Sequence, residues 1–458
     1  MPADGPDLVI LGGGFGGYCA AIRASQLGMK VSLVEEAKLG GTCLHLGCIP
    51  TKALLESSEL IARVRDRGAE FGIKTGDIGC DMEAIGKRRD SVVETLHRGV
   101  QGLMRKNKVE VVNGHGVVRD KNTIEVAGRR LEAPNVLIAT GSTPRSLAGI
   151  EIDGERIITS DHAVRAASIP RSVCIIGSGA VGVEFATFYR EMGAQVTVVE
   201  ALDRLVPLED ADVSEVLKKR FDRDGIQTRL STKVQEAART GDAVTVKLES
   251  GEIKTDVVLV AVGRAPRTKE VGLQEAGVKL GAGGIVEVDE WLRTSVDSIH
   301  AIGDAIGGYQ LAHAAVHEGV TAVEDIAGKR VEPIRQELIT RCTYCHPQIG
   351  SVGLTEAQAK EAGRKVKVGK FPFAAIGRAI IHGETEGFVK MVADADSSEL
   401  LGTHVIGPEA TELISEPALA QLFQGVAWEV GRNVHPHPTL TEAIGEAAMA
   451  VDGVALNI

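Results

Sequence analysis

The chain has 458 residues, a formal charge of −11 and 54 glycines. This length allows roughly three or four domains with their own cores, and the negative charge argues against nucleic acid as the main partner, because phosphate binding needs clustered cations. No apolar run approaches the ~18 residues of a membrane span, and seven cysteines are too few for a secreted disulfide scaffold, so we expect a cytoplasmic protein with no membrane attachment.

The N-terminus predicts a dinucleotide site. MPADGPD leads directly into the apolar strand LVIL, which leaves no room for a targeting peptide; a transit peptide removed earlier would instead indicate an organellar matrix. The strand is followed by Gly12, Gly14 and Gly17 in G-x-G-x-x-G spacing, a helix, and a second strand that ends at Glu35. In this fingerprint the glycines permit a tight turn, approach of a pyrophosphate and close helix packing, and the acid binds a ribose hydroxyl.

A pair of cysteines follows in GGTCLHLGCIPTKALL, residues 40–55. One continuous helix would turn Cys43 and Cys48 ~140° apart, whereas a disulfide needs Cα atoms within ~7 Å. We therefore expect an irregular turn at Gly47, a helix that starts at Pro50, and Lys52 in its first turn. A helix N-terminus favours the thiolate. The alternative is a pair of free core cysteines.

The nucleotide unit is repeated. SVCIIGSGAVGVEFA contains Gly177, Gly179 and Gly182, and the next strand ends at Glu200; in both copies the acid follows the first glycine by 23 residues. Two copies with the same spacing indicate two dinucleotides, which is typical of an electron-transfer enzyme. Glu200 favours NAD, because a carboxylate repels the 2′-phosphate of NADP, although Arg204 lies four residues further on.

The last third of the chain contains a predicted hairpin over 380–407 and a closing helix in TEAIGEAAMAV. Cys342, Cys345 and His346 spell C-x-x-C-H, formally a haem attachment site. We discount haem because the motif lies in an apparent strand of an acidic chain. Cys345 as a second redox or metal-sensitive thiol remains a hypothesis.

Taken in order, the motifs resemble those of the FAD- and NAD-linked disulfide oxidoreductases over essentially the whole chain, and most closely the members that oxidise dihydrolipoamide. The matching segments are GGGFGG, GGTCLHLGCIPTK, NVLIATGS, IIGSGAVGVEFA, LVAVGRAP, SIHAIGDA and HPHPTLTEA. The resemblance implies an α/β fold with two Rossmann-like dinucleotide-binding domains and a C-terminal α+β dimerisation domain. Its expected segments are an FAD domain (1–148), an NAD domain (149–267), a segment completing the FAD domain (268–336) and an interface domain (337–458).

The resemblance also implies roles for individual residues. FAD would occupy the N-terminal unit with help from Asp304, Cys48 would lie against the flavin, and Cys43 would face the substrate. Lys52 would lie beside the flavin and pair with Glu184; a cation near a helix N-terminus opposes the helix dipole, so it needs an external anion or water. Further cofactor contacts are implied for Thr140, Gly141 and Gly263.

A base is needed because a dithiol cannot attack a disulfide until one thiol loses its proton. His437 matches the family's base, Glu442 would orient it, and His435 would only help to hold the loop. The resemblance implies that this base comes from the other subunit of a homodimer. The implied reaction oxidises dihydrolipoamide on a lipoyl-bearing acyltransferase of a 2-oxoacid dehydrogenase complex, or on a glycine cleavage carrier protein, and reduces NAD without a metal ion.

Several alternatives stay open. His45 and Leu46 replace the usual Asn and Val, as in soluble pyridine nucleotide transhydrogenases, which lack the intact cysteine pair. Pro436 replaces a small residue and stiffens its loop. Glutathione-type and other disulfide reductases are further alternatives, although the glutathione type prefers NADPH through arginines where this chain has Glu200. A flavin-binding scaffold of a multienzyme complex is the non-enzymatic alternative.

Overall fold

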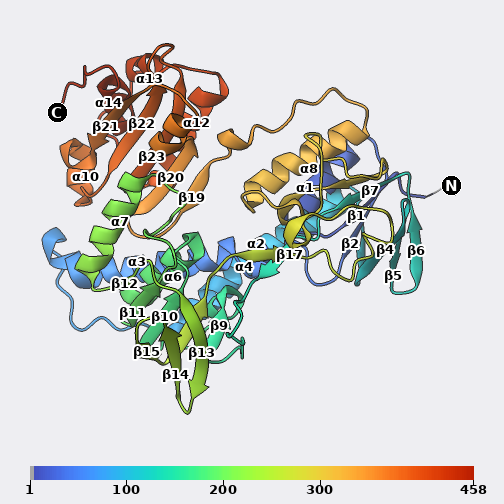
Figure 1. Cartoon of the computed structure of the whole chain (residues 1–458), viewed down its shortest axis with the longest axis horizontal. Coiled ribbons are helices and arrows are strands. Elements are labelled where there is room, and N and C mark those ends of the chain that lie inside the picture. Colours follow the sequence, from blue (N-terminus) through green and yellow to red (C-terminus); the bar gives the residue numbers. More distant parts are fainter. Residues whose placement is uncertain (1–4, 458) are drawn as a thin grey trace.

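The computed structural model describes residues 5–457, and three five-stranded sheets define an N-terminal, a central and a C-terminal lobe. Figure 1 shows the C-terminal lobe at the upper left, the central lobe below it and the N-terminal lobe at the right. Within the described residues no helix is long and apolar enough to cross a membrane.

The N-terminal lobe is built on a parallel sheet with the strand order β18-β7-β1-β2-β3. Its central strand is buried on both faces, which explains the uninterrupted apolar run LVIL. The strands are β1 (Leu8–Leu11), β2 (Val31–Glu35), β3 (Glu110–Asn113), β7 (Asn135–Ile138) and β18 (Ile299–Ala301). A three-stranded antiparallel sheet in the same lobe consists of β4 (Gly116–Asp120), β5 (Thr123–Val126) and β6 (Arg129–Glu132).

Two helices pack against each other and against one face of this sheet, α1 (Phe15–Gln26) and α8 (Ala312–Ile326). They approach so closely that a Cβ on Gly16 would lie 2.8 Å from the Ala315 carbonyl oxygen. Because β18 and α8 belong to residues 268–336, that segment returns to the N-terminal lobe, and the 3-10 turn η3 (Gly303–Ile306) lies between them.

Three helices follow β2: α2 (Gly41–His45), α3 (Cys48–Arg67) and α4 (Met82–Lys106). The expectation that the helix starts at Pro50 is wrong, because α3 begins at Cys48 and Lys52 consequently lies in its second turn. Figure 1 shows α3 and α4 running between the N-terminal and central lobes. The 3-10 turn η1 (Gly68–Phe71) follows directly after α3.

The central lobe repeats the strand–helix–strand unit of the N-terminal lobe in a parallel sheet ordered β12-β11-β10-β16-β9. Its elements are β9 (Ile157–Thr159), α5 (Ser160–Ala163), β10 (Ser172–Ile176), α6 (Ala180–Glu191), β11 (Gln195–Val199), α7 (Ala211–Asp224), β12 (Gln227–Arg229) and β16 (Val257–Val260). An antiparallel sheet covers it, made of β13 (Val234–Thr240), β14 (Ala243–Leu248) and β15 (Glu252–Thr255). The strands β8 (Ser142–Pro144) and β17 (Arg264–Pro266) pair where the chain passes between the two lobes.

The C-terminal lobe is an antiparallel sheet ordered β19-β20-β23-β22-β21. Its strands are β19 (Arg341–Thr343), β20 (Gln348–Gly353), β21 (Val366–Pro372), β22 (Phe388–Asp394) and β23 (Leu400–Gly407). Its helices are α9 (Glu356–Glu361), α10 (Gly377–His382), α11 (Ala410–Leu413), α12 (Ser415–Leu422), α13 (Ala427–Arg432) and α14 (Glu442–Ala450). Short 3-10 turns are η2 (Ala282–Gly284) in the N-terminal lobe, and η4 (Gln336–Leu338) and η5 (Phe373–Ala375) here.

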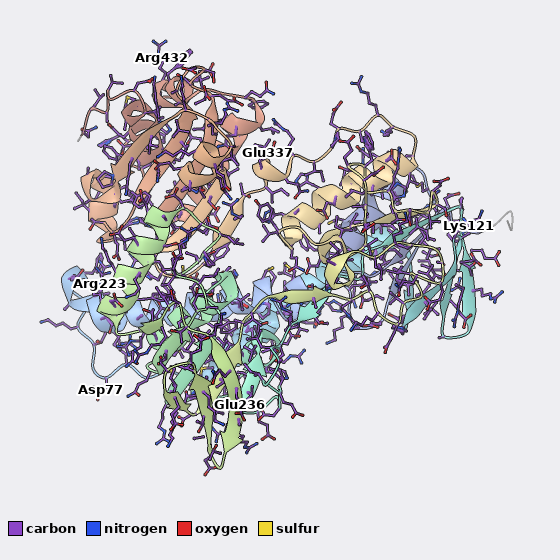
Figure 2. The ribbon with its side chains drawn as sticks, viewed as in Figure 1. Asp77, Lys121, Arg223, Glu236, Glu337 and Arg432 are labelled. Atoms are coloured by element: carbon purple, nitrogen blue, oxygen red, sulfur yellow. The ribbon has the colours of Figure 1, made fainter. Side chains whose placement is uncertain are left out.

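The hairpin expected over 380–407 forms as β22 and β23, but its first residues belong to α10. The closing helix forms as α14. The C-x-x-C-H motif is not contained in a strand, because β19 ends at Thr343 and the motif continues into the following loop. Figure 2 labels Arg223 at the end of α7, where its guanidinium lies 2.6 Å from Glu386 and joins the central lobe to the C-terminal lobe.

Candidate active site

The first glycine loop closes tightly around the strand–helix turn. Gly12 has φ +110°, and a Cβ there would lie 2.2 Å from the Ala139 carbonyl oxygen. A Cβ on Gly17 would lie 1.9 Å from the Gly12 carbonyl oxygen, so only glycine lets α1 reach the strand. Gly14 instead faces open space, and as N-cap of α1 it supplies no side-chain cap. The amides at this helix end therefore remain available to an anion such as a phosphate.

Polar groups surround this loop. Both carboxylate oxygens of Glu35 accept backbone hydrogen bonds, from the Gly13 amide at 2.7 Å and the Ala37 amide at 2.8 Å. The hydroxyl of Thr140 is buried and has no hydrogen-bond partner in the protein. Since a buried hydroxyl without a partner is costly, it fits a polar group of a bound molecule. These features together fit a dinucleotide at the carboxyl ends of the parallel strands.

Asp304 lies in η3, directly after β18, and accepts a hydrogen bond from the Ser142 hydroxyl. Arg264 Nε donates to the same hydroxyl at 2.7 Å and lies 3.8 Å from the Asp304 carboxylate. The Glu318 carboxylate accepts from the Gly303 amide at 2.7 Å, and its burial raises its pKa. The Asp304 carboxylate is thus held by neighbours from two parts of the chain, and Glu318 holds the backbone amide of the preceding residue.

The second glycine loop has the same construction. A Cβ on Gly177 would lie 2.4 Å from the Ala261 carbonyl oxygen, and one on Gly182 would lie 2.0 Å from the Gly177 carbonyl oxygen. Gly179 faces open space, as Gly14 does.

Glu200 ends β11 beside this second loop and accepts hydrogen bonds from the Ser178 amide at 2.8 Å and the Leu202 amide at 2.9 Å. The guanidinium of Arg204 donates to the Pro207 carbonyl. The carboxylates of Glu35 and Glu200 each accept a hydrogen bond from the glycine loop of their own nucleotide unit.

Gly141 and Gly263, two further residues expected to contact a cofactor, directly precede β8 and β17. Their φ values are +71° and +97°. The Gly141 carbonyl accepts from the Arg267 amide at 2.9 Å, and the Gly263 carbonyl accepts from the Arg145 amide at 3.0 Å. Both positive φ values explain why glycine is used at these turns.

The two cysteines lie on either side of the break between α2 and α3. Both are unbonded thiols, Cys43 half-buried and Cys48 exposed at the first residue of α3. A hydrogen bond from Cys43, aided by the positive charge of Lys52 against the cost of burial, lowers the pKa of Cys48 to about 7. The same hydrogen bond and burial raise the pKa of Cys43. Cys48 is consequently the thiolate of the pair, and Cys43 retains its proton.

Lys52 is held beside this thiolate. Its ammonium lies 2.8 Å and 2.7 Å from the two carboxylate oxygens of Glu184 on α6. The ring centroid of Tyr344 lies 4.6 Å from the same ammonium. Although burial opposes it, the Glu184 carboxylate raises the pKa of Lys52, so the side chain stays charged. The structure thus brings together Cys43, Cys48, Lys52 and Glu184.

His437 and Glu442 form a second group. His437 Nδ1 lies 2.9 Å from Glu442 Oε1, and the Thr439 amide donates to Glu442 Oε2 at 3.0 Å. Although burial opposes it, these hydrogen bonds hold the pKa of Glu442 below its usual value. His435 faces elsewhere: its Nε2 lies 2.8 Å from Glu416, whose carboxylate raises the pKa of His435.

The His437–Glu442 pair is not brought to the cysteines within one chain. Glu442 begins α14 in the C-terminal lobe, and Figure 1 shows α14 at the upper left, whereas α2 lies near the centre of the view. The His437 side chain is 77% exposed. This geometry leaves the imidazole able to meet a group outside its own chain.

Sequence reasoning missed the contributions of Tyr344, Ser142 and Arg264. The sequence signal for Tyr344 is its position inside the C-x-x-C-H segment, between Cys342 and Cys345. Cys345 is buried, and burial raises the pKa of its thiol, which disfavours a reactive thiol. Among the described residues no group of three or more His, Cys, Asp or Glu side chains could hold a metal ion.

His45, which replaces the usual Asn in the dithiol segment, contacts Leu39 and His97. Its Nε2 lies 2.9 Å from the Leu39 carbonyl oxygen, and its ring meets that of His97 edge-on with centroids 5.1 Å apart. Burial lowers the pKa of His45. The ring is therefore held neutral against the segment that leads into α2.

Comparisons with known proteins cover nearly the whole chain. The family model described as pyridine nucleotide-disulphide oxidoreductase matches residues 6–319, and the dimerisation domain of that family matches residues 339–448. Among curated relatives, dihydrolipoyl dehydrogenase of Bacillus subtilis is 44% identical, with 98% of this chain and 99% of the relative covered. Dihydrolipoyl dehydrogenase of Zymomonas mobilis is 42% identical, with 99% and 100% covered.

A solved structure shows the same fold. LpdA from Mycobacterium tuberculosis is 29% identical and superposes with a TM-score of 0.91 over 96% of this chain and 98% of that one. Both glycine loops and the sheets of the N-terminal and central lobes lie within residues 6–319, and the sheet of the C-terminal lobe lies within residues 339–448, the two ranges matched by the family models.

Proposed function

This chain belongs to the pyridine nucleotide-disulphide oxidoreductase family, and from this premise we propose that it acts as a dihydrolipoyl dehydrogenase. It oxidises protein-bound dihydrolipoamide to lipoamide and reduces NAD+ to NADH. The family implies FAD and a pyridine nucleotide as cofactors. The observation that carries the proposal is the placement of Cys43 and Cys48 beside the Lys52–Glu184 pair, where the pKa of Cys48 is lowered to about 7.

The unequal acidity of the two thiols supports a direction for the thiol exchange. In the oxidised enzyme a substrate thiolate attacks Cys43 Sγ, the Cys43–Cys48 bond breaks, and Cys48 leaves as the thiolate. Because its pKa is about 7, Cys48 is a good leaving group near neutral pH. The second substrate thiol loses its proton to solvent, and its thiolate attacks the substrate sulfur bound to Cys43; this releases lipoamide, and the departing Cys43 sulfur takes the proton of the first substrate thiol to become a thiol.

His437 supplies the proton transfers in this proposal. Its imidazole, oriented by Glu442 at 2.9 Å, accepts the proton of the first substrate thiol and returns a proton to Cys43. An imidazole titrates near neutral pH and serves in both directions. Since His437 is exposed and separate from the cysteines of its own chain, we propose that it serves the dithiol of the partner subunit.

FAD is assigned to the N-terminal lobe, where it would accept two electrons from the dithiol and pass a hydride to NAD. The open Gly14 face would admit its pyrophosphate, Glu35 its ribose, and Asp304 and Thr140 its remaining polar groups. NAD is assigned to the central lobe, with its pyrophosphate at Gly179. Glu200, fixed by the Ser178 amide, supports NAD over NADP because its carboxylate repels a 2′-phosphate.

The dimerisation domain supports a homodimer. An exposed apolar group on the C-terminal lobe is available to a second copy, since Leu419, Leu422, Phe423 and Val434 are 52%, 53%, 75% and 92% exposed. Such a patch on a protein surface typically marks an interface. For the second partner we propose a lipoyl-bearing acyltransferase of a 2-oxoacid dehydrogenase complex, or a glycine cleavage carrier protein. Bacterial relatives support a cytoplasmic location.

Assaying the purified protein for NADH production from dihydrolipoamide tests the proposal. We expect turnover with NAD+, much less with NADP+, and none in Cys48→Ser. A flavoprotein that produces no NADH from dihydrolipoamide would refute the proposed activity. Hydride exchange between NADH and an NADP+ analogue without any dithiol would favour the transhydrogenase alternative, to which His45 and Leu46 point.

A further inference from the structure

A short segment of the C-terminal lobe reaches the redox centre. Residues 344–346 lie between β19 and β20 and contact α6 at successive turns. The Tyr344 amide donates to Glu184 Oε1 at 2.9 Å, and the His346 amide donates to Thr187 Oγ1 at 3.4 Å. His346 Nδ1 lies 3.6 Å from Glu191. Because these α6 residues are three and four positions apart, they share one helix face, and the segment runs along it.

The same face of α6 also holds α3. Lys52 pairs with Glu184, and one turn and a half later the Ser58 hydroxyl donates to Glu191 Oε2 at 2.5 Å. Three parts of the chain therefore meet here: α3, which begins with Cys48, α6 of the central lobe, and the 344–346 segment of the C-terminal lobe.

Tyr344 contacts both members of the Lys52–Glu184 pair. Its amide donates to the carboxylate oxygen that accepts from Lys52, and its ring centroid lies 4.6 Å from the ammonium. A cavity of about 890 Å³ along this junction is lined by Tyr344 and His346 but not by Lys52. The Tyr344 ring therefore covers the ammonium on the side of that cavity, while 32% of the Lys52 side chain stays exposed. A cation held against an aromatic face is attracted more strongly when it is shielded from water.

The contact with Tyr344 matters because Lys52 acts on Cys48. Lysine has a long flexible stem, and one carboxylate partner does not by itself fix the position of its ammonium. The charged groups that act on the Cys48 sulfur are Lys52 on α3 and Glu184 on α6, and the neutral Cys43 thiol on α2 acts through a hydrogen bond. Of these, only Lys52 brings a positive charge, so its position controls how well the thiolate is stabilised.

We propose that Tyr344 is a positioning residue that holds the Lys52 ammonium beside the Cys48 thiolate, so that the C-terminal lobe controls the ionisation of the redox thiol. This inference rests on the proposed function and deepens it. It makes the loop between β19 and β20 part of the redox machinery, through a ring and an amide that do not themselves touch the reacting sulfur atoms.

The test is a pH titration of Cys48 in the reduced holoenzyme, followed by the long-wavelength absorbance of a thiolate next to the flavin. We expect a midpoint near 7 for the unchanged protein. Tyr344→Leu keeps the amide but removes the ring, and should raise the midpoint by about half a unit to one unit. Tyr344→Phe keeps the ring and should titrate like the unchanged protein.

His346→Asn is the matched control, because it removes a contact to α6 in the same loop without touching Lys52. Its midpoint should remain at the wild-type value. The proposal is overturned if Tyr344→Leu titrates like the unchanged protein, or if His346→Asn shifts the midpoint as far as Tyr344→Leu does. If Tyr344→Leu does not fold with flavin bound, Tyr344→Met supplies the same comparison.

NADH production from dihydrolipoamide is measured in parallel. An unchanged protein that titrates as expected but does not oxidise dihydrolipoamide would refute the proposed substrate and leave the role of Tyr344 standing. If the unchanged protein oxidises dihydrolipoamide but Tyr344→Leu does not shift the midpoint, the proposed substrate stands and the role of Tyr344 is refuted.

Discussion

The imidazole of His437 is exposed to solvent, but its orientation is determined by Glu442, which also accepts the Thr439 amide. A carboxylate that is itself held by a backbone amide keeps its partner in one orientation. Nδ1 then carries the proton shared with Glu442, and Nε2 is left to accept a proton from a thiol. The 2.9 Å contact between His437 Nδ1 and Glu442 Oε1 thus orients an exposed histidine so that its Nε2 can act as a base.

Replacing this base separates thiol chemistry from flavin chemistry. His437→Gln should lower kcat for dihydrolipoamide oxidation by about 100-fold or more. Glu442→Gln keeps the shape but exchanges a charge-assisted hydrogen bond for a neutral one, so we expect a loss on the order of tenfold. Steady-state NADH production measures both. NADH-dependent reduction of an artificial electron acceptor, which needs no thiol proton, is the control, and an equal loss there would argue against the assigned role.

At the scale of elements, the molecule uses the same strand–turn–helix unit twice, and the glycines within each unit do different work. Gly17 and Gly182 lie where a Cβ would collide with the carbonyl of the first glycine, at 1.9 Å and 2.0 Å. Gly14 and Gly179 have open space before them and extended backbone that accepts any residue. Packing within the protein therefore requires glycine at positions 17 and 182. At positions 14 and 179 glycine is needed only to leave room for a ligand.

This distinction predicts opposite outcomes for matched substitutions in the central lobe. Gly179→Ala should leave thermal unfolding unchanged and raise KM for NAD, because its methyl group occupies space meant for the pyrophosphate. Gly182→Ala should lower the unfolding temperature, because overpacking of this kind costs about 1–3 kcal/mol. Thermal unfolding and KM for NAD are measured on both variants. Equal destabilisation by the two would contradict the separate roles.

Across the whole molecule, buried charges join the central lobe to the C-terminal lobe. Lys390 on β22 is 3% exposed and lies 2.9 Å from Asp210, which precedes α7. Asp212 and Glu356 lie 3.1 Å and 2.8 Å from the same ammonium. Nearby, Arg341 pairs with Glu209. These contacts place the lobe that carries His437 relative to the nucleotide domains, although a buried ion pair need not add stability over an apolar pair.

Removing the cation should be costly because it leaves Asp210 buried and unpaired. Lys390→Met should lower the free energy of unfolding by about 3–5 kcal/mol, measured by urea unfolding at pH 7. Asp210→Asn in the Lys390→Met background is the control, since it removes the stranded charge and should recover part of the loss. A double variant no more stable than Lys390→Met would contradict this account.

The same cluster predicts how stability depends on pH. Although burial opposes it, Lys390 holds the pKa of Asp210 below the usual value, and Lys370 together with Lys390 does the same for Asp212. A carboxylate with a lowered folded-state pKa contributes stability above its unfolded pKa, about 4, and this contribution is lost as the pH falls through the folded value. The urea concentration at the unfolding midpoint should therefore decrease as the pH is lowered below about 4. This decrease should be less steep in Lys390→Met than in the unchanged protein.

Much of this organisation could be predicted from the sequence because the signals are local. Gly12, Gly14 and Gly17 lie within one turn, and the apolar runs beside them identify the strands that meet there. The start of α3 was harder: Pro50 is a good first residue of a helix, but the helix extends two residues further toward Gly47 and takes in Cys48. Helix ends depend on contacts that propensity does not contain.

The chemistry that is available follows from the amino-acid sequence: two nucleotide loops, a dithiol beside the first, and a histidine 389 positions after Cys48, since each depends on residue types at short spacing. Which of these groups meet depends on the packing of the lobes. Lys52 finds Glu184 across 132 positions, and Tyr344 reaches that carboxylate across 160. Such contacts follow from how the lobes pack, because a buried charge accepts whatever partner the surrounding fold brings within hydrogen-bond distance.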